Sequence, residues 1–179
     1  IIKAEDLLDD IKQGVLTRSR NKKVAEQVAL GAVKYSFLRS DISKGTTFDP
    51  EASLNLEGDT GPYLQYTHAR FKSILRKTAI FKKKIPVLIR MTSLEKRLAV
   101  ALLRFPEAIE DAVNSFSPST LVNYLHSTAM IANEFYHSHP VAQEKDKIKK
   151  QFRVGLVEAT TIILKQGLSI LGIFAPDKM

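Results

Sequence analysis

Apolar residues recur every three or four positions through most of the chain, and this spacing restricts the possible folds more than any other feature. Between residues 21 and 39, four apolar positions fall on one helical stripe: Val24, Val28, Ala32 and Tyr35. A stripe of this kind is typical of an α-helix that buries one face. Because the same spacing returns in both halves of the chain, the sequence predicts an all-α fold.

The first half of the chain is predicted to hold three helices and a long loop. Residues 40–58 contain glycine, proline and many short polar side chains, so we expect a loop there, with one helical turn near Glu51. The motif Asp59-Thr60-Gly61-Pro62 then supplies a capping residue and a proline in the first turn, which is a typical helix start. The helices expected in this half cover residues 4–13, 21–39 and 59–79.

Residues 82–91 separate the two halves. This segment is basic, contains Pro86 and has a largely β-branched run from Ile85 to Ile89, so it suits a short strand or an extended connector. We interpret it as a linker between two helical units.

The second half carries clearer helix starts and stops. Thr92 and Glu95 have the spacing of a capping box, and Ser117-Pro118 combines an N-cap residue with a proline at the first helical position. The last helix is expected to end with Gly167 as its C′ residue, and 168–175 to pack back on an antiparallel bundle. We expect four helices in this half. The first follows Thr92 and stops at Phe105-Pro106, a short second one ends at Phe116, and the last two cover 118–137 and 143–166. The inward positions expected on the last helix are Ile148, Phe152, Leu156 and Ile163.

The composition excludes several classes of protein. Without cysteine, the chain cannot form a disulfide scaffold, a thiolate zinc site, an iron–sulfur cluster or a cysteine nucleophile. The longest uncharged apolar stretch, 167–175, is far shorter than the ~20 residues of a membrane helix, and no secretory leader begins at Ile1. We therefore expect a soluble intracellular protein. Since the chain opens on isoleucine rather than methionine, either its first residues were removed or it is a piece of a longer protein.

Positive charge is concentrated in one fifth of the sequence. The chain has a net charge of +8, and the window 70–104 holds eleven basic residues against one acid, Glu95, which is +10 and leaves −2 for the rest. Such a concentration attracts polyanions, because each neutralised phosphate releases a condensed counterion. The window therefore favours a nucleic-acid partner, and a solvated lysine-rich face without a partner is the alternative.

Residues that could carry catalysis are scarce. Glu134 and His137 have the Glu-x-x-His spacing of di-metal helix bundles, with His126 three turns earlier, but the last helix offers only Glu158 and no second histidine. No phosphate-binding glycine loop occurs. We expect no metal site and no active site from these residues.

Aromatic side chains offer another route to nucleic-acid binding, because they can stack on unpaired bases. The spacing places Tyr124 and Phe135 in the core, whereas Tyr136 is turned about 100° from Phe135 and is expected at the surface. Tyr136 could equally cover the end of its helix without binding anything. The five candidates are Tyr63, Tyr66, Tyr124, Phe135 and Tyr136.

One stretch of the chain closely resembles a signature of the arginyl-tRNA synthetases. It is Leu-Glu-Gly-Asp-Thr-Gly-Pro-Tyr-Leu-Gln-Tyr-Thr-His-Ala-Arg-Phe-Lys-Ser-Ile-Leu-Arg-Lys, residues 56–77. Further similar motifs follow the family's order along nearly the whole chain. They are Val28–Tyr35, Leu103–Glu107, Tyr124–Tyr136, Pro140-Val141, Arg153–Leu156 and Gly167–Met179.

The resemblance implies a C-terminal piece of such an enzyme. Residues 1–84 would be the helical stem of a class I catalytic module, and 92–179 the anticodon-binding helix bundle of the DALR type. The family's His-x-Gly-His and Lys-Met-Ser-Lys-Ser motifs do not occur here, so we expect no catalytic residue, no cofactor and no activity from this chain alone. ATP with Mg, and arginine, would bind only the missing catalytic part. The resemblance also implies a cytoplasmic monomer with no membrane contact, which recognises tRNA(Arg).

The resemblance further assigns residues that bind tRNA. Tyr136 and Met179 match positions that contact the anticodon loop in the family, and Asn133 belongs to the same Asn-x-Phe-Tyr motif. The helix after Gly-Asp-Thr-Gly-Pro abuts the tRNA, which gives Tyr66 and Arg70 structural or backbone-contact roles, and Arg76 is grouped with them. Val154 and Gly155 depart from the family's usual leucine and alanine. The alternative function is a free-standing helical protein-interaction module with no RNA partner, and a metal enzyme comes third.

Overall fold

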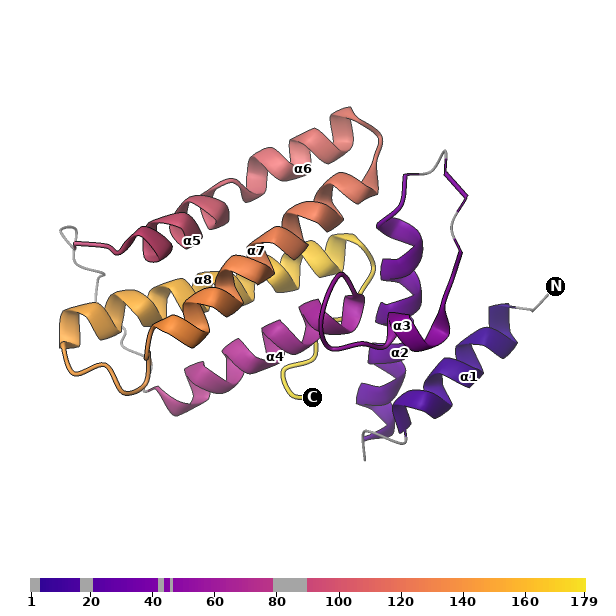
Figure 1. The fold of residues 1–179 in the computed structure, drawn as a ribbon, viewed down its shortest axis with the longest axis horizontal. Coiled ribbons are helices and arrows are strands. Elements are labelled where there is room, and N and C mark those ends of the chain that lie inside the picture. Colours follow the sequence, from indigo (N-terminus) through magenta and orange to yellow (C-terminus); the bar gives the residue numbers. More distant parts are fainter. Residues whose placement is uncertain (1–3, 17–20, 42–43, 46, 79–89) are drawn as a thin grey trace.

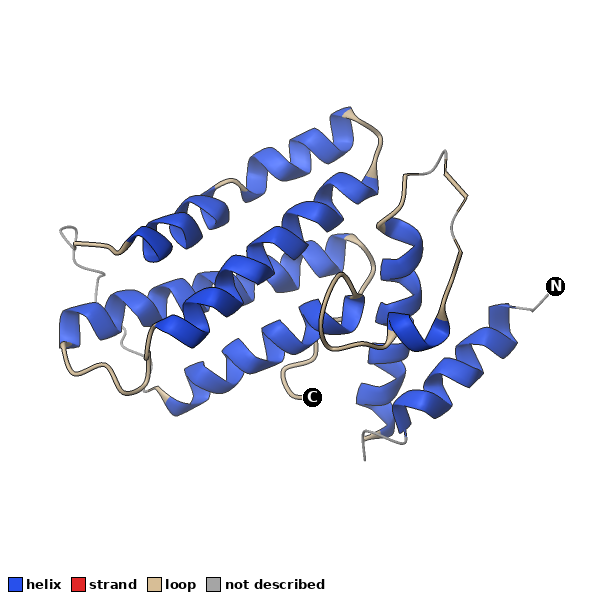
Figure 2. Cartoon of the chain, in the orientation of Figure 1, coloured by secondary structure: helices blue, strands red, loops and turns tan. Residues whose placement is uncertain are grey.

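The computed structural model describes residues 4–16, 21–41, 44–45, 47–78 and 90–179, and every regular element within these ranges is a helix (Figures 1 and 2). The predicted all-α fold is therefore confirmed. Most of the predicted linker, 82–91, lies outside the described residues. The helices are α1 (Ala4–Leu16), α2 (Lys22–Leu38), α3 (Pro50–Ser53), α4 (Gly61–Lys77), α5 (Ser93–Leu103), α6 (Phe105–Asn114), α7 (Pro118–Ser138) and α8 (Lys147–Ile170).

The five helices α4 to α8 form an elongated bundle, and α1 and α2 lie across one end of it (Figure 1). In this bundle α4 packs along α8, α5 and α6 follow one another beside α7, and α2 meets the start of α4. None of the helices in the described ranges is long and apolar enough to cross a membrane.

Three apolar clusters hold these helices together. The first joins α2, α4, α7 and α8 around Tyr35 and Leu125, and the second joins α4, α5, α7 and α8 around Phe71 and Phe135. The third lies between α1 and α2. The predicted return of the C-terminal segment is confirmed, because Ile173 and Ala175 are buried in the first cluster. The segment after α8 is thus part of the bundle's core, whereas α1 packs on α2 in a cluster of its own.

Two of the predicted helix starts are built as the sequence indicates. The Thr60 side chain accepts a hydrogen bond from the Tyr63 amide at the start of α4. At the start of α5, Thr92 and Glu95 form a complete capping box. Ser117 is also confirmed as an N-cap residue before Pro118, although its hydroxyl pairs with Ser119 at 2.8 Å and caps no amide.

The last helix differs from the prediction at both ends. It begins later, because the Asp146 side chain accepts hydrogen bonds from the first amides of α8. It also continues past Gly167, so this glycine is not a C′ residue. A Cβ on Gly167 would lie 2.4 Å from the Leu125 side chain, and the missing side chain therefore lets α7 and α8 pack closely. Ile148 is 52% exposed instead of inward, because it lies in the first turn, ahead of the first buried residue of α8, Arg153.

The start of α4 is fixed by a backbone contact with α2. A Cβ on Gly61 would lie 2.4 Å from the carbonyl oxygen of Gly31, which only a residue without a side chain permits. Beside this contact, the buried Tyr35 hydroxyl donates to Asp59, and Arg39 lies 3.8 Å from the same carboxylate. Burial, followed by this hydrogen bond, raises the pKa of Tyr35, so the phenol stays protonated as a donor.

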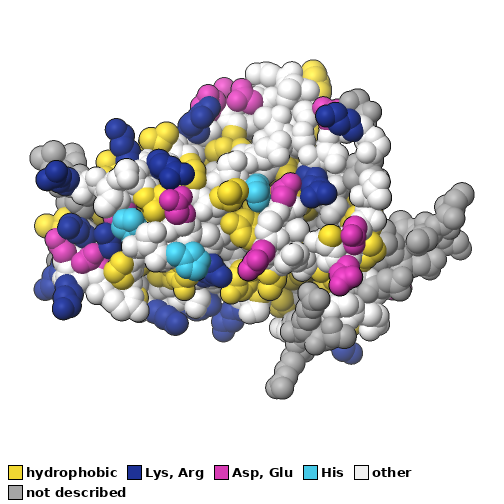
Figure 3. Space-filling view, viewed as in Figure 1, with side chains coloured by type: hydrophobic (Ala, Val, Ile, Leu, Met, Phe, Trp, Pro, Cys, Tyr) yellow, Lys and Arg dark blue, Asp and Glu magenta, His cyan; other side chains and the backbone are white. Residues whose placement is uncertain are grey.

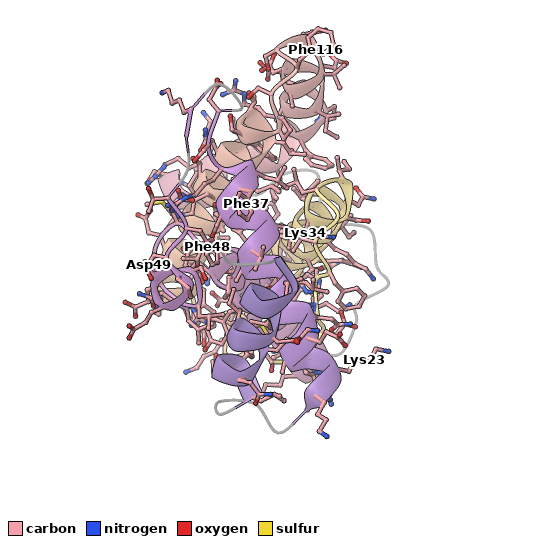
Figure 4. The ribbon with its side chains drawn as sticks, turned by 90° about the vertical axis from the view of Figure 1, so that its right-hand side faces the viewer. Lys23, Lys34, Phe37, Phe48, Asp49 and Phe116 are labelled. Carbon is pink, nitrogen blue, oxygen red and sulfur yellow. The ribbon has the colours of Figure 1, made fainter. Side chains whose placement is uncertain are left out.

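Figure 4 views the molecule from the end formed by α1 and α2. Phe37 of α2 stacks on Phe48, with 5.8 Å between ring centroids, and so attaches the segment before α3 to α2. The Lys34 ammonium donates to the carbonyl oxygen of Gly172, just after α8. These contacts join α2 to segments that lie far from it in the sequence.

Candidate nucleic-acid interface

Two tyrosine rings on neighbouring helices enclose one arginine. The Cζ atom of Arg70 lies 4.6 Å from the ring centroid of Tyr66, one turn earlier on α4, and 5.0 Å from that of Tyr136 on α7. Both distances suit cation–π attraction. We call Tyr66, Arg70, Asn133 and Tyr136 the tyrosine–arginine cluster. The structure thus brings together four of the six residues that the sequence analysis assigned to tRNA.

Asn133 fixes the direction of the arginine. Its side-chain oxygen accepts a 2.9 Å hydrogen bond from Nη1 of Arg70. Its amide nitrogen donates to the Tyr63 hydroxyl at 3.0 Å and to Thr67 Oγ1 at 2.8 Å. With 9% of its surface exposed, Asn133 therefore has a determined amide orientation, and it joins α7 to α4.

Tyr136 presents the exposed part of the cluster. It is 38% exposed, whereas its neighbour Phe135 is fully buried, as the helical spacing predicted. Its ring also contacts Phe71, with 6.4 Å between centroids. Tyr136 is therefore held on two sides by α4 and still offers ring surface to a ligand.

Met179 lies next to the cluster. Together with Tyr66 it lines an apolar cavity of about 260 Å³ between α1, α2, α4 and the C-terminal segment. The other lining residues are Val15, Val24, Val28, Leu54 and Leu56. We call this cavity the Met179 pocket. It extends the candidate site from the tyrosine–arginine cluster towards the N-terminal helices.

A row of polar side chains on α4 holds the C-terminal segment in place. Gln65 donates to the carbonyl oxygen of Phe174 at 2.7 Å and to that of Gln27 at 3.0 Å. His68 bonds the carbonyl oxygen of Pro176 at 3.0 Å, and Lys72 lies 3.9 Å from the Asp177 carboxylate. The row ends with Arg76, whose Nη1 donates to the Asp177 carbonyl oxygen at 2.9 Å. Arg76 thus contacts the C-terminal segment, away from the tyrosine–arginine cluster.

The sequence analysis missed Gln65, His68 and Lys72. Their spacing of three and four residues, continued by Arg76, places them on one face of α4. The sequence pattern already predicted that this helix packs against the rest of the chain. A polar stripe on such a helix could have indicated that another segment of the chain binds there. Nothing in the sequence alone names the residues that this stripe holds.

His68 is neutral in this arrangement. Burial lowers its pKa, although the hydrogen bond to Pro176 acts in the opposite direction. Because Nδ1 must donate to the carbonyl, Nε2 is left unprotonated, and it has no partner among the described residues. A proton on Nε2 would be a buried donor without an acceptor.

Positive side chains gather at the end of the bundle where α4 stops and α5 and α8 begin (Figure 3, left). We call the exposed members of this group whose side chains make no salt bridge or hydrogen bond to a described residue the basic end: Lys77, Arg90, Lys96, Lys145, Lys147 and Lys149. Sequence analysis missed Lys145 and the two lysines of α8, which all lie outside the window 70–104. They join the others only because α8 packs beside α5.

Part of the basic window is neutralised within the fold. Arg97 pairs with Glu134 at 3.3 Å, and Arg104 with Glu107 at 2.9 Å. Glu134 is therefore engaged by an arginine rather than by a histidine. The described residues contain no group of three or more His, Cys, Asp or Glu side chains that could hold a metal ion.

A helical bundle with an exposed tyrosine held beside an arginine, and with a basic end, is typical of the nucleic-acid-binding class of protein. Residues 64–179 match the family model described as "DALR anticodon binding domain". The chain belongs to this family.

Relatives and solved structures agree with the family. An arginine–tRNA ligase of Bacteroides thetaiotaomicron is 31% identical over 195 residues, covering 100% of this chain and 33% of the relative. One from Thermococcus kodakarensis is 37% identical, covering 99% and 28%. The Thermus thermophilus arginyl-tRNA synthetase structure aligns with a TM-score of 0.91 at 32% identity, over 99% of this chain and 32% of that one. The resemblance found in the sequence is confirmed, and the chain spans about a third of the length of these relatives.

Proposed function

We propose that this chain recognises tRNA(Arg) through the anticodon loop, as part of an arginine–tRNA ligase. The observation that carries the proposal is the tyrosine–arginine cluster, where Arg70 is held by Asn133 against the exposed ring of Tyr136. A ring fixed in this way can stack on an unpaired base without losing much conformational freedom.

The proposed contacts divide into positioning and recognition. The basic end would bind phosphates, which sets the register of the RNA without reading its sequence. Tyr136, held by Arg70, would stack on one base of the loop, and Tyr66 and Met179 would enclose a neighbouring one at the Met179 pocket. Asn133 orients Arg70, and Arg76 serves binding by holding the segment that carries Met179.

The chemistry of ligation is assigned to other parts of the enzyme. This chain has neither the His-x-Gly-His nor the Lys-Met-Ser-Lys-Ser motif. We propose that ATP with Mg, and arginine, bind a catalytic module of which residues 1–84 form the helical stem, while 92–179 form the anticodon-binding bundle. A cytoplasmic, monomeric enzyme is part of the same proposal.

The test is a titration of the chain with tRNA(Arg) and with the same tRNA carrying substituted anticodon bases, at several salt concentrations. We expect binding that weakens with salt, with a log–log slope of about −0.7 to −0.9 for each phosphate contacted. The substituted tRNAs should bind more weakly at every salt concentration. Equal binding of all the tRNAs, or none by the folded chain, would contradict the proposal. A protein partner bound independently of salt would instead support the interaction module.

A further inference from the structure

The turn between α7 and α8 is held rigidly by side chains of α8. Arg153 donates to the carbonyl oxygen of Pro140 at 3.1 Å, and Lys150 donates to that of Ala142 at 2.7 Å. Val141, which lies between Pro140 and Ala142, is 4% exposed and packs in the second apolar cluster. The backbone of the turn therefore has a fixed shape before any ligand arrives.

The same arginine connects the turn to the start of α5. Its Nε donates to the buried Glu95 at 2.7 Å, and its Nη1 donates to Glu144 at 2.6 Å. Burial alone would raise the pKa of Glu95, but the hydrogen bonds from the Thr92 amide and from Arg153 outweigh it and lower the pKa. Glu95 is thus ionised. The ion pairs of Arg153 with Glu95 and Glu144 therefore join the start of α5, the turn and α8.

A second cavity, of about 210 Å³, lies between this turn and the end of α4. A cavity of roughly 150 Å³ is enough for a benzene ring, so this one can admit a single planar ring. Tyr136 of α7 and His139 at its C-terminal end form one wall of this cavity. Ile74 and Lys77 of α4, with the turn residues Ala142 and Gln143, form the rest together with Pro140 and Val141. We call it the turn pocket. Tyr136 therefore belongs both to the tyrosine–arginine cluster and to the turn pocket.

The turn pocket combines the three groups that bind a nucleotide. Tyr136 offers an aromatic surface, and Lys77 is an exposed ammonium without a salt bridge to a described residue. The Gln143 amide, which has a donor and an acceptor side by side, makes no hydrogen bond to a described residue and can bond the edge of a base. An apolar ligand would leave the ammonium and the amide unused.

We propose that the turn pocket receives a second unpaired nucleotide of the anticodon loop, distinct from the one at the Met179 pocket, with Lys77 on its phosphate and Gln143 on its base. This inference rests on the proposed function and adds to it a specificity residue outside the tyrosine–arginine cluster. The base of this nucleotide would stack on Tyr136, which lines the turn pocket but not the Met179 pocket.

The experiment measures binding of an anticodon stem-loop RNA, and of versions with each loop base substituted in turn, to three variants of the chain. Gln143→Ala should lose discrimination at one loop position, by about 5- to 100-fold, and keep it elsewhere. Lys77→Gln should weaken binding of all the RNAs by a similar factor and reduce the salt slope by about 1. Lys23→Gln is the matched control, because this exposed lysine lies at the start of α2 and its side chain points away from the bundle (Figure 4).

Ala142→Phe tests the pocket by filling it. We expect weaker RNA binding with an unchanged melting temperature, and no further loss when the RNA lacks the base to which Gln143 is assigned. Full affinity and full discrimination in both Ala142→Phe and Gln143→Ala would overturn the turn pocket while leaving the proposed function in place. If the unaltered, folded chain bound no stem-loop, the proposed function would fail first.

Discussion

At the scale of single residues, Tyr136 carries the clearest functional consequence. Replacing it with alanine removes the exposed ring of the tyrosine–arginine cluster, and we expect tRNA(Arg) affinity to fall by about 1–3 kcal/mol, the usual range for a base–aromatic stack. Tyr136→Phe keeps the ring and should retain most of the affinity. An alanine variant that is folded and binds as tightly as the original would make Tyr136 a residue that only covers the helix end.

His68 makes the stability of the fold depend on pH. Its pKa is lower in the folded chain than its ordinary value of 6.5, so the unfolded chain takes up a proton first as pH falls. The stabilisation is fully present above about pH 6.5 and is lost as pH falls through the lower, folded pKa. We expect the melting temperature to drop over this interval, and to drop less in His68→Asn, whose amide can still donate to Pro176. Parallel curves for the two proteins would contradict the assignment.

Sequence could predict some of these residue roles and not others. Tyr66 and Arg70 are four apart on a predicted helix, so their contact follows from helical geometry. The contact of Arg70 with Tyr136 depends on how α4 and α7 are aligned, which no local pattern encodes. Arg153 was noted only within a family motif, because its partner Glu95 lies 58 residues away.

At the scale of helices, the start of α4 depends on the contact between Gly31 and Gly61. Gly61→Ala would push a methyl group into a backbone carbonyl, and because backbone cannot rotate away, we expect a loss near the upper end of the 1–3 kcal/mol typical of overpacking. For a chain of this size that is a fall of about 10 °C in melting temperature.

Gly45→Ala is the control for this substitution. A Cβ there meets no atom within 4 Å, so the change should stay within about 0.5 kcal/mol. Equal melting temperatures for the two variants would show that the contact between α2 and α4 can relax.

Helix starts were predicted better than helix ends. Thr60 and Thr92 start their helices through local hydrogen bonds, which a short motif specifies. Gly167 has the identity of a helix terminator, but it lies buried inside α8, where a Cβ would lie 2.4 Å from the Leu125 side chain of α7. The helix ends instead just before Gly172, which has a positive φ of 68°, and the Ile173 amide donates to the Leu168 carbonyl oxygen as in a left-handed helix terminus. The sequence therefore offered two candidate terminating glycines, and packing against α7 excluded the first.

At the scale of the whole molecule, Arg76 could support RNA binding in two ways: by holding the C-terminal segment or by contacting a phosphate directly. If it holds the C-terminal segment, as its bond to Asp177 indicates, Arg76→Ala should weaken tRNA binding without changing the salt slope. A direct phosphate contact would instead lower the slope by about 1. Titrations of Arg76→Ala at several salt concentrations distinguish these two roles. A changed slope would contradict the role of Arg76 in holding the C-terminal segment.

The two faces of α4 limit how this protein can vary in length. One face holds the C-terminal segment through Gln65, His68, Lys72 and Arg76, and an adjacent one carries Tyr66 and Arg70. Deleting or inserting one residue in the helix would turn everything after it by about 100° and separate both sets from their partners at once. Length variation among homologues should therefore avoid α4 and accumulate in the loop before α3.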